Sequence, residues 1–271
     1  SSLTELDLRG NQLCTVPERL KQLTSLMVLN LYNTQLSTLP DWIGQLTSLV
    51  DLVVHNNQLR ALPESIGQLS ALTGLTLDNN EITNLPESIG QLTALKVLNL
   101  YDNQLTTLPE SIGQLSSLSE LRVGNNQLSV LPDSIGQLGS LVELVLLGNH
   151  LVVVPESIGQ LRSLVDLNLS DNQLTALPDS IGELSSLMWL FLSANQLGEL
   201  PESVGNLTSL IELDISANQL TALPESIGKL TSLSDLKPYD NLLTSVPDAI
   251  ANMDCLKGYI EEILEEIEAR R

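Results

Sequence analysis

An asparagine and a proline recur along this chain at a fixed interval, and the interval limits what the chain can fold into. Eleven of the twelve prolines follow one another at steps of 23 residues, from Pro17 to Pro247. Thr34 stands where the asparagine series has its one gap, and the series comprises Asn11, Asn57, Asn80, Asn103, Asn126, Asn149, Asn172, Asn195, Asn218 and Asn241. Because such a period is the signature of repeat architectures, the sequence predicts a stack of similar coils.

The unit is spelled L-x-x-L-x-L-x-x-N-x-L-x-x-L-P-E-S-I-G-Q-L-T-S, and each part predicts a local structure. The alternation from Leu29 to Leu31 predicts a short strand with one buried side. The asparagine amide is expected to pair with backbone groups of its own coil and the next. Proline followed by an acid favours a single helical or 3-10 turn. A glycine, as at Gly90, is expected to end that turn.

One coil alone offers too few aliphatic side chains to offset the entropy of ordering it, about 1–2 kcal/mol per residue. Stacked coils bury their faces against one another, and their strands align as one parallel sheet at about 4.8 Å spacing. The turn side is bulkier than the strand side. We therefore predict an α/β solenoid that is curved, with the sheet on its concave face.

The 23-residue L-P-x-x-I-G-x-L-x-x-L spelling resembles the leucine-rich repeat family, in particular its intracellular Ras-group subclass and similar bacterial and protist repeats. The resemblance spans residues 1–257. It implies a horseshoe that serves as a protein–protein interaction module, often attached to a GTPase, kinase, ligase or PDZ domain. It names no partner.

The two ends of the repeat array differ from its middle. The chain enters in mid-unit, so an exposed apolar edge at Leu3, Leu6 and Leu8 is expected, with further repeats or a cap before it. Pro238 has no N–H for a sheet, so the ladder is expected to end or bulge there. Residues 258–271 have apolar residues at helical spacing and predict an amphipathic capping helix, with a coiled-coil or partner-binding helix as the alternative. The domains are therefore 1–257 and 258–271.

Charge and cysteine content exclude several classes of function. Asp and Glu number 33 against 12 Lys and Arg, and a formal net charge of −21 disfavours nucleic-acid backbones and anionic membrane surfaces. No apolar stretch approaches the roughly 18 residues of a membrane helix. Cys14 and Cys255 lie near opposite ends, which favours a reducing compartment and a cytoplasmic location.

Residues that could carry chemistry are sparse. The only histidines, His55 and His150, lie four coils apart, or about 20 Å. No phosphate-binding or zinc-protease motif is present. Asp51, His55 and Asp78 would share one face, but two carboxylates and one imidazole are incomplete for tetrahedral zinc. We therefore predict no catalytic residues, no metal and no cofactor, so the chain is not expected to be an enzyme.

Comparison of the coils with each other locates a candidate binding surface. The turn segments are nearly identical, whereas the outward strand positions differ from coil to coil. Large apolar residues in those positions, around Asn168 and Ser170, are Val145, Leu147, Trp189 and Phe191. Their predicted rim comprises Glu120, Glu143, Asp166, Glu212 and Asp214, with Arg122 as the only nearby cation. Tyr32 and Tyr101 belong to the same predicted face.

The sequence thus predicts a noncatalytic interaction module that binds a protein or peptide on its concave sheet. Its aromatic anchors and acidic rim favour a basic partner with an apolar anchor, although the acids could equally form a solvated face. One alternative is the sensor or substrate-recruiting region of a larger signalling enzyme. Another is a self-assembling structural solenoid, whereas the isolated chain is expected to be a monomer.

Overall fold

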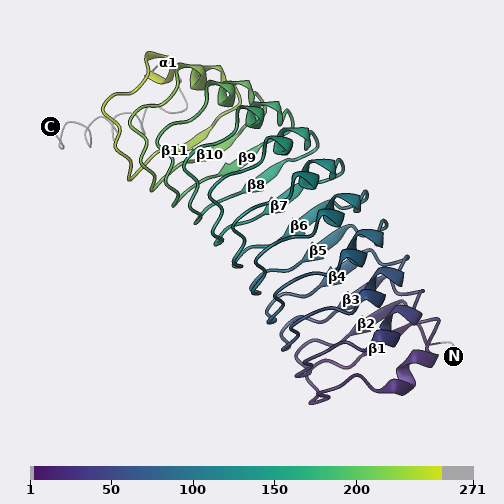
Figure 1. Cartoon of the computed structure of the whole chain (residues 1–271). Coiled ribbons are helices and arrows are strands. Elements are labelled where there is room, and N and C mark those ends of the chain that lie inside the picture. The colour runs from purple at the N-terminus through teal and green to yellow at the C-terminus, as the bar shows by residue number, and fades with distance from the viewer. Residues whose placement is uncertain (1–2, 252–271) are drawn as a thin grey trace. The chain divides into compact units, whose positions relative to one another are not determined.

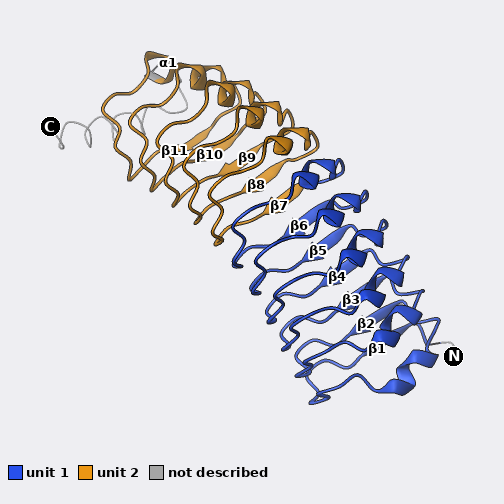
Figure 2. Cartoon of the chain, in the orientation of Figure 1, with its two compact units in different colours: residues 1–141 blue, residues 142–271 orange. Residues whose placement is uncertain are grey.

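The computed structural model describes residues 3–251, which belong to two compact units. Unit 1 ends at Leu141 and unit 2 begins at Val142 (Figure 2). Within each unit, strands lie along one side of the coils and short helical turns along the other (Figure 1). This alternation confirms the predicted strand-and-turn unit.

Unit 1 contains six described strands and six 3-10 turns. Its elements in chain order are β1 (Glu5–Asp7), η1 (Glu18–Gln22), β2 (Val28–Asn30), η2 (Asp41–Gln45), β3 (Asp51–Val53), η3 (Glu64–Gln68), β4 (Gly74–Thr76), η4 (Glu87–Gln91), β5 (Val97–Asn99), η5 (Glu110–Gln114), β6 (Glu120–Arg122) and η6 (Asp133–Gln137).

Unit 2 continues the pattern and has an α-helical turn at the end of its described part. Its elements are β7 (Glu143–Val145), η7 (Glu156–Gln160), β8 (Asp166–Asn168), η8 (Asp179–Glu183), β9 (Trp189–Phe191), η9 (Glu202–Asn206), β10 (Glu212–Asp214), η10 (Glu225–Lys229), β11 (Asp235–Lys237) and α1 (Asp248–Ala251).

Neighbouring strands in each unit are parallel and pair in a constant register. Leu29 of β2 lies opposite Leu52 of β3, and Leu167 of β8 lies opposite Leu190 of β9. From β2 onward, the central leucine of each strand is buried and the residues on either side are half-buried. The strands begin one residue before the L-x-L run. The repeat therefore fixes which side chains enter the core and which remain on the strand face.

The asparagine series forms the predicted ladder, with one difference in direction. The Asn103 amide nitrogen donates to the carbonyl of Leu100 in its own coil (3.1 Å) and to that of Leu77 in the preceding coil (3.0 Å). Its oxygen accepts the N–H of Ile82, 3.0 Å away. The amide of Asn103 thus bridges its own coil and the preceding one, whereas the prediction from the sequence named the next one.

Thr34 fills the gap in the ladder by a different arrangement. Its side chain is fully buried, and its hydroxyl donates to the carbonyl of Leu31 at 2.7 Å. In other coils the equivalent N–H donates to the side-chain oxygen of an asparagine. The N–H of Leu13 donates instead to the backbone carbonyl of Thr34, at 3.1 Å. The backbone thus replaces the missing amide oxygen.

The expectation that glycine ends the turn is wrong. Gly90 lies inside η4, and the residue that follows the turn is Leu92. A Cβ atom at Gly90 would lie 2.5 Å from the carbonyl oxygen of Ser111 and 2.8 Å from its Cβ. Glycine is required here because successive turns approach more closely than a side chain permits.

The first described coil has the exposed apolar edge that the sequence predicts. Leu3 is 42% exposed, and Leu6 and Leu8 are half-buried, whereas Leu26 and Leu29 in the next coil have no exposed surface. The predicted helix at 258–271 lies outside the described residues. Within residues 3–251, no helix is long and apolar enough to cross a membrane.

The last described strand explains the role of Pro238. The N–H of Ile215 donates to the carbonyl of Lys237 at 3.0 Å, which joins the ends of β10 and β11. Pro238 occupies the equivalent place one coil later, directly after β11, and has no N–H to donate. Pro238 therefore cannot donate the hydrogen bond that Ile215 makes one coil earlier, and because the next coil lies outside the described residues, the end or bulge of the ladder here stays a prediction.

Candidate functional site

The strand face of unit 2 brings together the apolar residues that the sequence singled out. Trp189 of β9 lies in register between Asp166 of β8 and Glu212 of β10. Phe191, two residues further along β9, lies between Asn168 and Asp214. Since alternate strand residues leave the sheet on the same side, both rings belong to the strand face.

Val145 and Leu147 complete this set. Val145 of β7 pairs with Asn168, so the order across the sheet is Val145, Asn168, Phe191. Leu147 follows the strand and is half-buried, like Val145 and both rings. We call Val145, Leu147, Trp189 and Phe191 the unit 2 patch. Half-burial leaves each side chain with surface that a ligand could cover.

Two cations lie on the strand face beside the predicted acids, rather than one. Lys237 of β11 donates a hydrogen bond to Glu212 and forms an ion pair with Asp235 at 3.3 Å. The hydrogen bond to Glu212 is the main reason that the pKa of Lys237 is raised to about 12. The statement that Arg122 is the only nearby cation is therefore wrong. The repeat places Lys237 on the strand face, but its bond to Glu212 could not be predicted because ion pairs depend on rotamers.

The surroundings of Asp166 disfavour its charged form. Burial raises its pKa above the ordinary value of 3.8, and the negative charges of Glu143 and Glu212 raise it further. Among the described residues no ion pair is formed by Asp166. A cationic group brought to this position would relieve the repulsion among these carboxylates.

Three other predicted site residues, Arg122, Tyr32 and Tyr101, lie on the strand face of unit 1, whereas Ser170 lies in unit 2 after β8. Arg122 of β6 pairs with Glu120 of the same strand at 3.0 Å. Tyr32 and Tyr101 follow β2 and β5 and are half-buried. Each has its N–H bonded to the asparagine two residues before it, at 3.0 Å from Asn30 and 3.1 Å from Asn99. The prediction that these residues act with the unit 2 patch stays a prediction.

Asp51, His55 and Asp78, considered above as metal ligands, have other surroundings. His55 stacks on Tyr32 with ring centroids 4.4 Å apart. The carboxylate of Asp51 lies beside Gly74, and burial raises the pKa of Asp51 above its usual value. Asp78 accepts hydrogen bonds from two amides. Within residues 3–251 no three His, Cys, Asp or Glu side chains lie close enough together to hold a metal ion.

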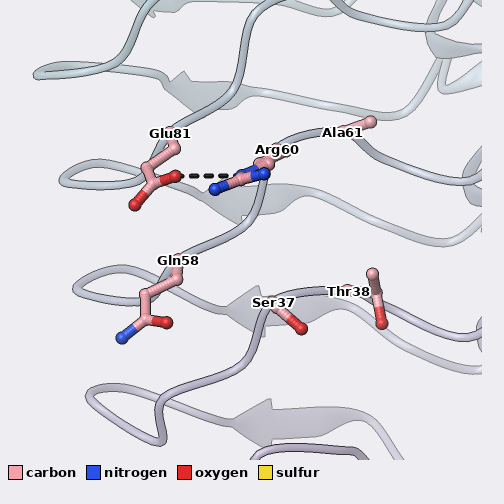
Figure 3. Close-up of a pocket in the computed structure, with 6 residues that line it drawn as sticks. All are labelled: Ser37, Thr38, Gln58, Arg60, Ala61 and Glu81. Atoms are coloured by element: carbon pink, nitrogen blue, oxygen red, sulfur yellow. Dashed lines mark hydrogen bonds and ion pairs between the residues drawn. The ribbon is translucent and has the colours of Figure 1, made fainter.

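A hollow of about 330 Å³ lies in unit 1 on the loops that follow the ladder residues. Its lining comprises Ser37, Thr38, Gln58, Arg60, Ala61 and Glu81, and Arg60 bonds to Glu81 at 3.1 Å (Figure 3). The sequence interpretation missed this hollow. Equally small residues such as Ser129, Ala176 and Gly198 stand in the same columns of other coils, so the repeat gives no signal for this hollow.

Stacked parallel strands, an asparagine ladder and 3-10 turns define the class of protein, and the sequence comparison gives the family. Profiles described as leucine-rich repeat regions match residues 67–151, residues 1–59 and 139–197, and residues 209–230. No curated protein matched the sequence. The chain belongs to the leucine-rich repeat family, whose members are generally noncatalytic protein-interaction modules.

Solved structures of this family resemble the chain over most of its length. A leucine-rich repeat protein of Leptospira interrogans is 34% identical, with 93% of this chain and 82% of that one covered and a TM-score of 0.55. The Arabidopsis receptor kinase HAESA, in complex with the peptide hormone IDA and a co-receptor, is 33% identical with a TM-score of 0.74. That match covers 89% of this chain but 46% of the HAESA chain, less than half.

An internalin of Listeria monocytogenes shares the fold at 21% identity, with a TM-score of 0.66 and coverage of 94% of this chain and 85% of that one. The neighbours include ligand-binding receptors, and a protein-interaction role is consistent with them. They do not single out a site on this chain.

Proposed function

We propose that this chain is a noncatalytic interaction module whose unit 2 strand face binds a protein or peptide segment that carries an apolar anchor beside basic residues. One observation carries the proposal. Trp189 and Phe191, the latter the only phenylalanine of the chain, are half-buried on one strand with carboxylates on both neighbouring strands. Binding energy usually concentrates where aromatic anchors are surrounded by polar groups.

The basic character of the partner follows from the charge balance of the same face. Lys237 is already paired with Glu212 and Asp235. Asp166 has no such partner among residues 3–251, and the net charge of the chain is −21. A basic segment would therefore be attracted during association and would approach faster at low salt. HAESA, which is described with a bound peptide hormone, supports a peptide as one kind of partner.

A second candidate function is ligand recognition on behalf of a signalling enzyme. The HAESA match favours it, because HAESA is a receptor kinase and this chain corresponds to less than half of it. We also propose a reducing, cytoplasmic location, since Cys14 is a free and exposed thiol that oxidation would otherwise reach. The isolated chain is proposed to be a monomer, which sedimentation would test.

The test begins with selection of peptides from a random displayed library against the wild-type chain. Selected peptides are expected to combine a large apolar residue with Lys or Arg. Trp189→Ala and Phe191→Ala should each weaken their binding at least about tenfold, as expected for truncation of a binding anchor. The matched control is Val153→Ala, since Val153 is 54% exposed on a loop after Asn149 and not on the strand face.

Thermal unfolding of the same variants separates binding from folding. Both aromatic side chains are half-buried outside the leucine core, so melting temperatures should change little. Normal affinity in both folded variants would place the site elsewhere. An association rate that is indifferent to salt would remove the basic partner from the proposal.

A further inference from the structure

A second arrangement of side chains, in unit 1, has a different chemistry from the unit 2 patch. Tyr32, His55, Asp78 and Tyr101 occupy the same place in four successive coils, the second residue after strands β2 to β5. We call them the unit 1 row. The backbone hydrogen bonds confirm that they are neighbours: Asn33 donates to the carbonyl of His55, Asn56 to that of Asp78, and Asn79 to that of Tyr101, at distances of 2.9–3.2 Å.

Two members of the row form a flat platform. The rings of Tyr32 and His55 stack with centroids 4.4 Å apart and an angle of 29° between their planes. The Tyr32 hydroxyl accepts a hydrogen bond from the Asn56 amide at 3.4 Å. The Nδ1 atom of His55 is shielded from solvent and has no hydrogen-bond partner within the described residues. The two rings therefore contact each other, and His55 makes no hydrogen bond to Asp78 through its Nδ1 atom.

The carboxylate of Asp78 is held in place by neutral donors. Asn99 donates to its Oδ1 at 3.0 Å and Asn79 to its Oδ2 at 3.2 Å. A carboxylate has about four acceptor positions, so each oxygen keeps one for another donor. Amides orient the carboxylate without neutralising its charge, and no ion pair involves Asp78 within residues 3–251.

A short carboxylate therefore lies in a row between two ring-bearing neighbours, about 4.8 Å from each along the sheet. The group that matches this setting is flat, cationic and able to donate two parallel hydrogen bonds. A guanidinium has all three properties, because it stacks on aromatic faces and pairs with a carboxylate through two N–H groups. An ammonium is a point charge and cannot stack.

The other charges of this strand face agree with a cationic occupant. Its cations are already paired, Arg9 with Asp7 and Arg122 with Glu120, each at 3.0 Å. We propose that the unit 1 row is a second binding site, in which Asp78 pairs with an arginine side chain of a peptide while the His55 and Tyr101 rings flank its guanidinium. This site is distinct from the unit 2 patch and does not require it.

The test uses three capped tripeptides as probes: acetyl-Gly-Arg-Gly-amide and its lysine and citrulline counterparts. Citrulline keeps the flat shape and loses the charge. In amide-detected NMR titrations of the full chain, the arginine peptide should shift resonances of residues around Asp78. Its affinity should exceed that of either counterpart at least about threefold, because only arginine combines stacking with a charged bidentate pair.

Three variants decide where the probe binds. Asp78→Asn keeps the shape and should weaken the arginine peptide at least about fivefold, because charged hydrogen bonds are roughly twice as strong as neutral ones. Asp41→Asn makes the same charge change in the exposed first position of η2 and should have no effect. The double variant Trp189→Ala/Phe191→Ala should also bind the probe normally, even if the proposed function of the unit 2 patch fails.

Several results would overturn the proposal. These are equal affinity for arginine and citrulline, equal affinity for arginine and lysine, unchanged binding to Asp78→Asn, or no resonance shifts around the row at millimolar probe. Loss of probe binding in the unit 2 double variant would move the site to that patch. Because shift mapping uses the wild-type chain, the result does not depend on how well a variant folds.

Discussion

The two sides of each coil follow different rules. On the turn side, E-S-I-G-Q recurs almost unchanged, and the structure shows contacts that require it. On the strand face, the outward positions hold residues as different as Gly74, Glu143 and Trp189. Those positions are half-buried, so each side chain there keeps some exposed surface. Uniformity marks contact between coils, and variation marks surface that is available for other molecules.

Contacts between turns explain the uniformity in detail. Gly90 faces the carbonyl of Ser111, and Gly159 faces that of Ser180 in the same way, with 2.5 Å to a hypothetical Cβ in both cases. The acid that opens a turn also reaches the next one, as Glu202 accepts the N–H of Ser226 at 3.2 Å. A change at one of these positions would have to be matched in the neighbouring coil. Substitutions on the strand face carry no such condition.

The largest expected effect is a substitution that blocks the contact between turns. Gly90→Ala places a Cβ against a backbone carbonyl, and backbone cannot move away as a flexible side chain can. Overpacking of this kind costs about 1–3 kcal/mol and sometimes more, so we expect a loss near 3 kcal/mol of unfolding free energy. Urea unfolding followed by circular dichroism measures it.

Gly198 provides the matched control within the same chain. A Cβ at Gly198 would meet no atom within 4 Å, and its φ angle is not in the left-handed region. Gly198→Ala should therefore be neutral or slightly stabilising, by roughly 0.4–1 kcal/mol through the unfolded state. Similar losses from the two substitutions would show that close approach of the turns is not what selects glycine.

A smaller loss is expected when a ladder residue is removed. Asn103→Ala leaves the N–H of Ile82 and the carbonyls of Leu77 and Leu100 without their amide partners. A buried polar group left without a partner costs about 1–3 kcal/mol. Because water that enters the vacated space offsets part of the cost of these three groups, we expect a loss of about 2 kcal/mol of unfolding free energy. Asn11→Ala is the control, because Asn11 is exposed in the first described coil and should cost clearly less. Equal losses would contradict the role of burial.

How far the sequence could predict the molecule follows from the same contrast. A 23-residue period fixes which residues of one coil are equivalent to which of the next, so strands, ladder and outward columns could all be predicted. It does not say whether Asn103 reaches forward or backward, because both neighbours have the same sequence pattern. It also could not reveal why Gly90 is glycine, since a turn ending and a close approach both favour that residue.

The candidate site was predictable only as a set of positions. Trp189, Phe191 and Val145 could be placed on one face from strand alternation and the repeat alone. The Lys237–Glu212 bond and the Tyr32–His55 stack could not, because they depend on which rotamers half-exposed side chains adopt. Periodicity constrains the backbone and the core, whereas contacts among individual surface side chains occur once each and leave no period.

The smallest expected effect concerns Asp166, and it sharpens the claim that the strand face is not optimised for stability. Burial, then Glu143 and Glu212, raise the pKa of its carboxyl in the folded chain above 3.8. The neutral carboxyl is therefore favoured in the folded chain. Its contribution to stability is fully present below pH 3.8 and is lost as the pH rises through the folded-state pKa.

Asp166→Asn removes the charge and should raise the melting temperature slightly at pH 7, with no gain at pH 3, where the carboxyl is neutral in both states. A lower melting temperature for Asp166→Asn at pH 7 would mean that the ionised carboxylate stabilises unit 2, and that this part of the strand face belongs to the scaffold.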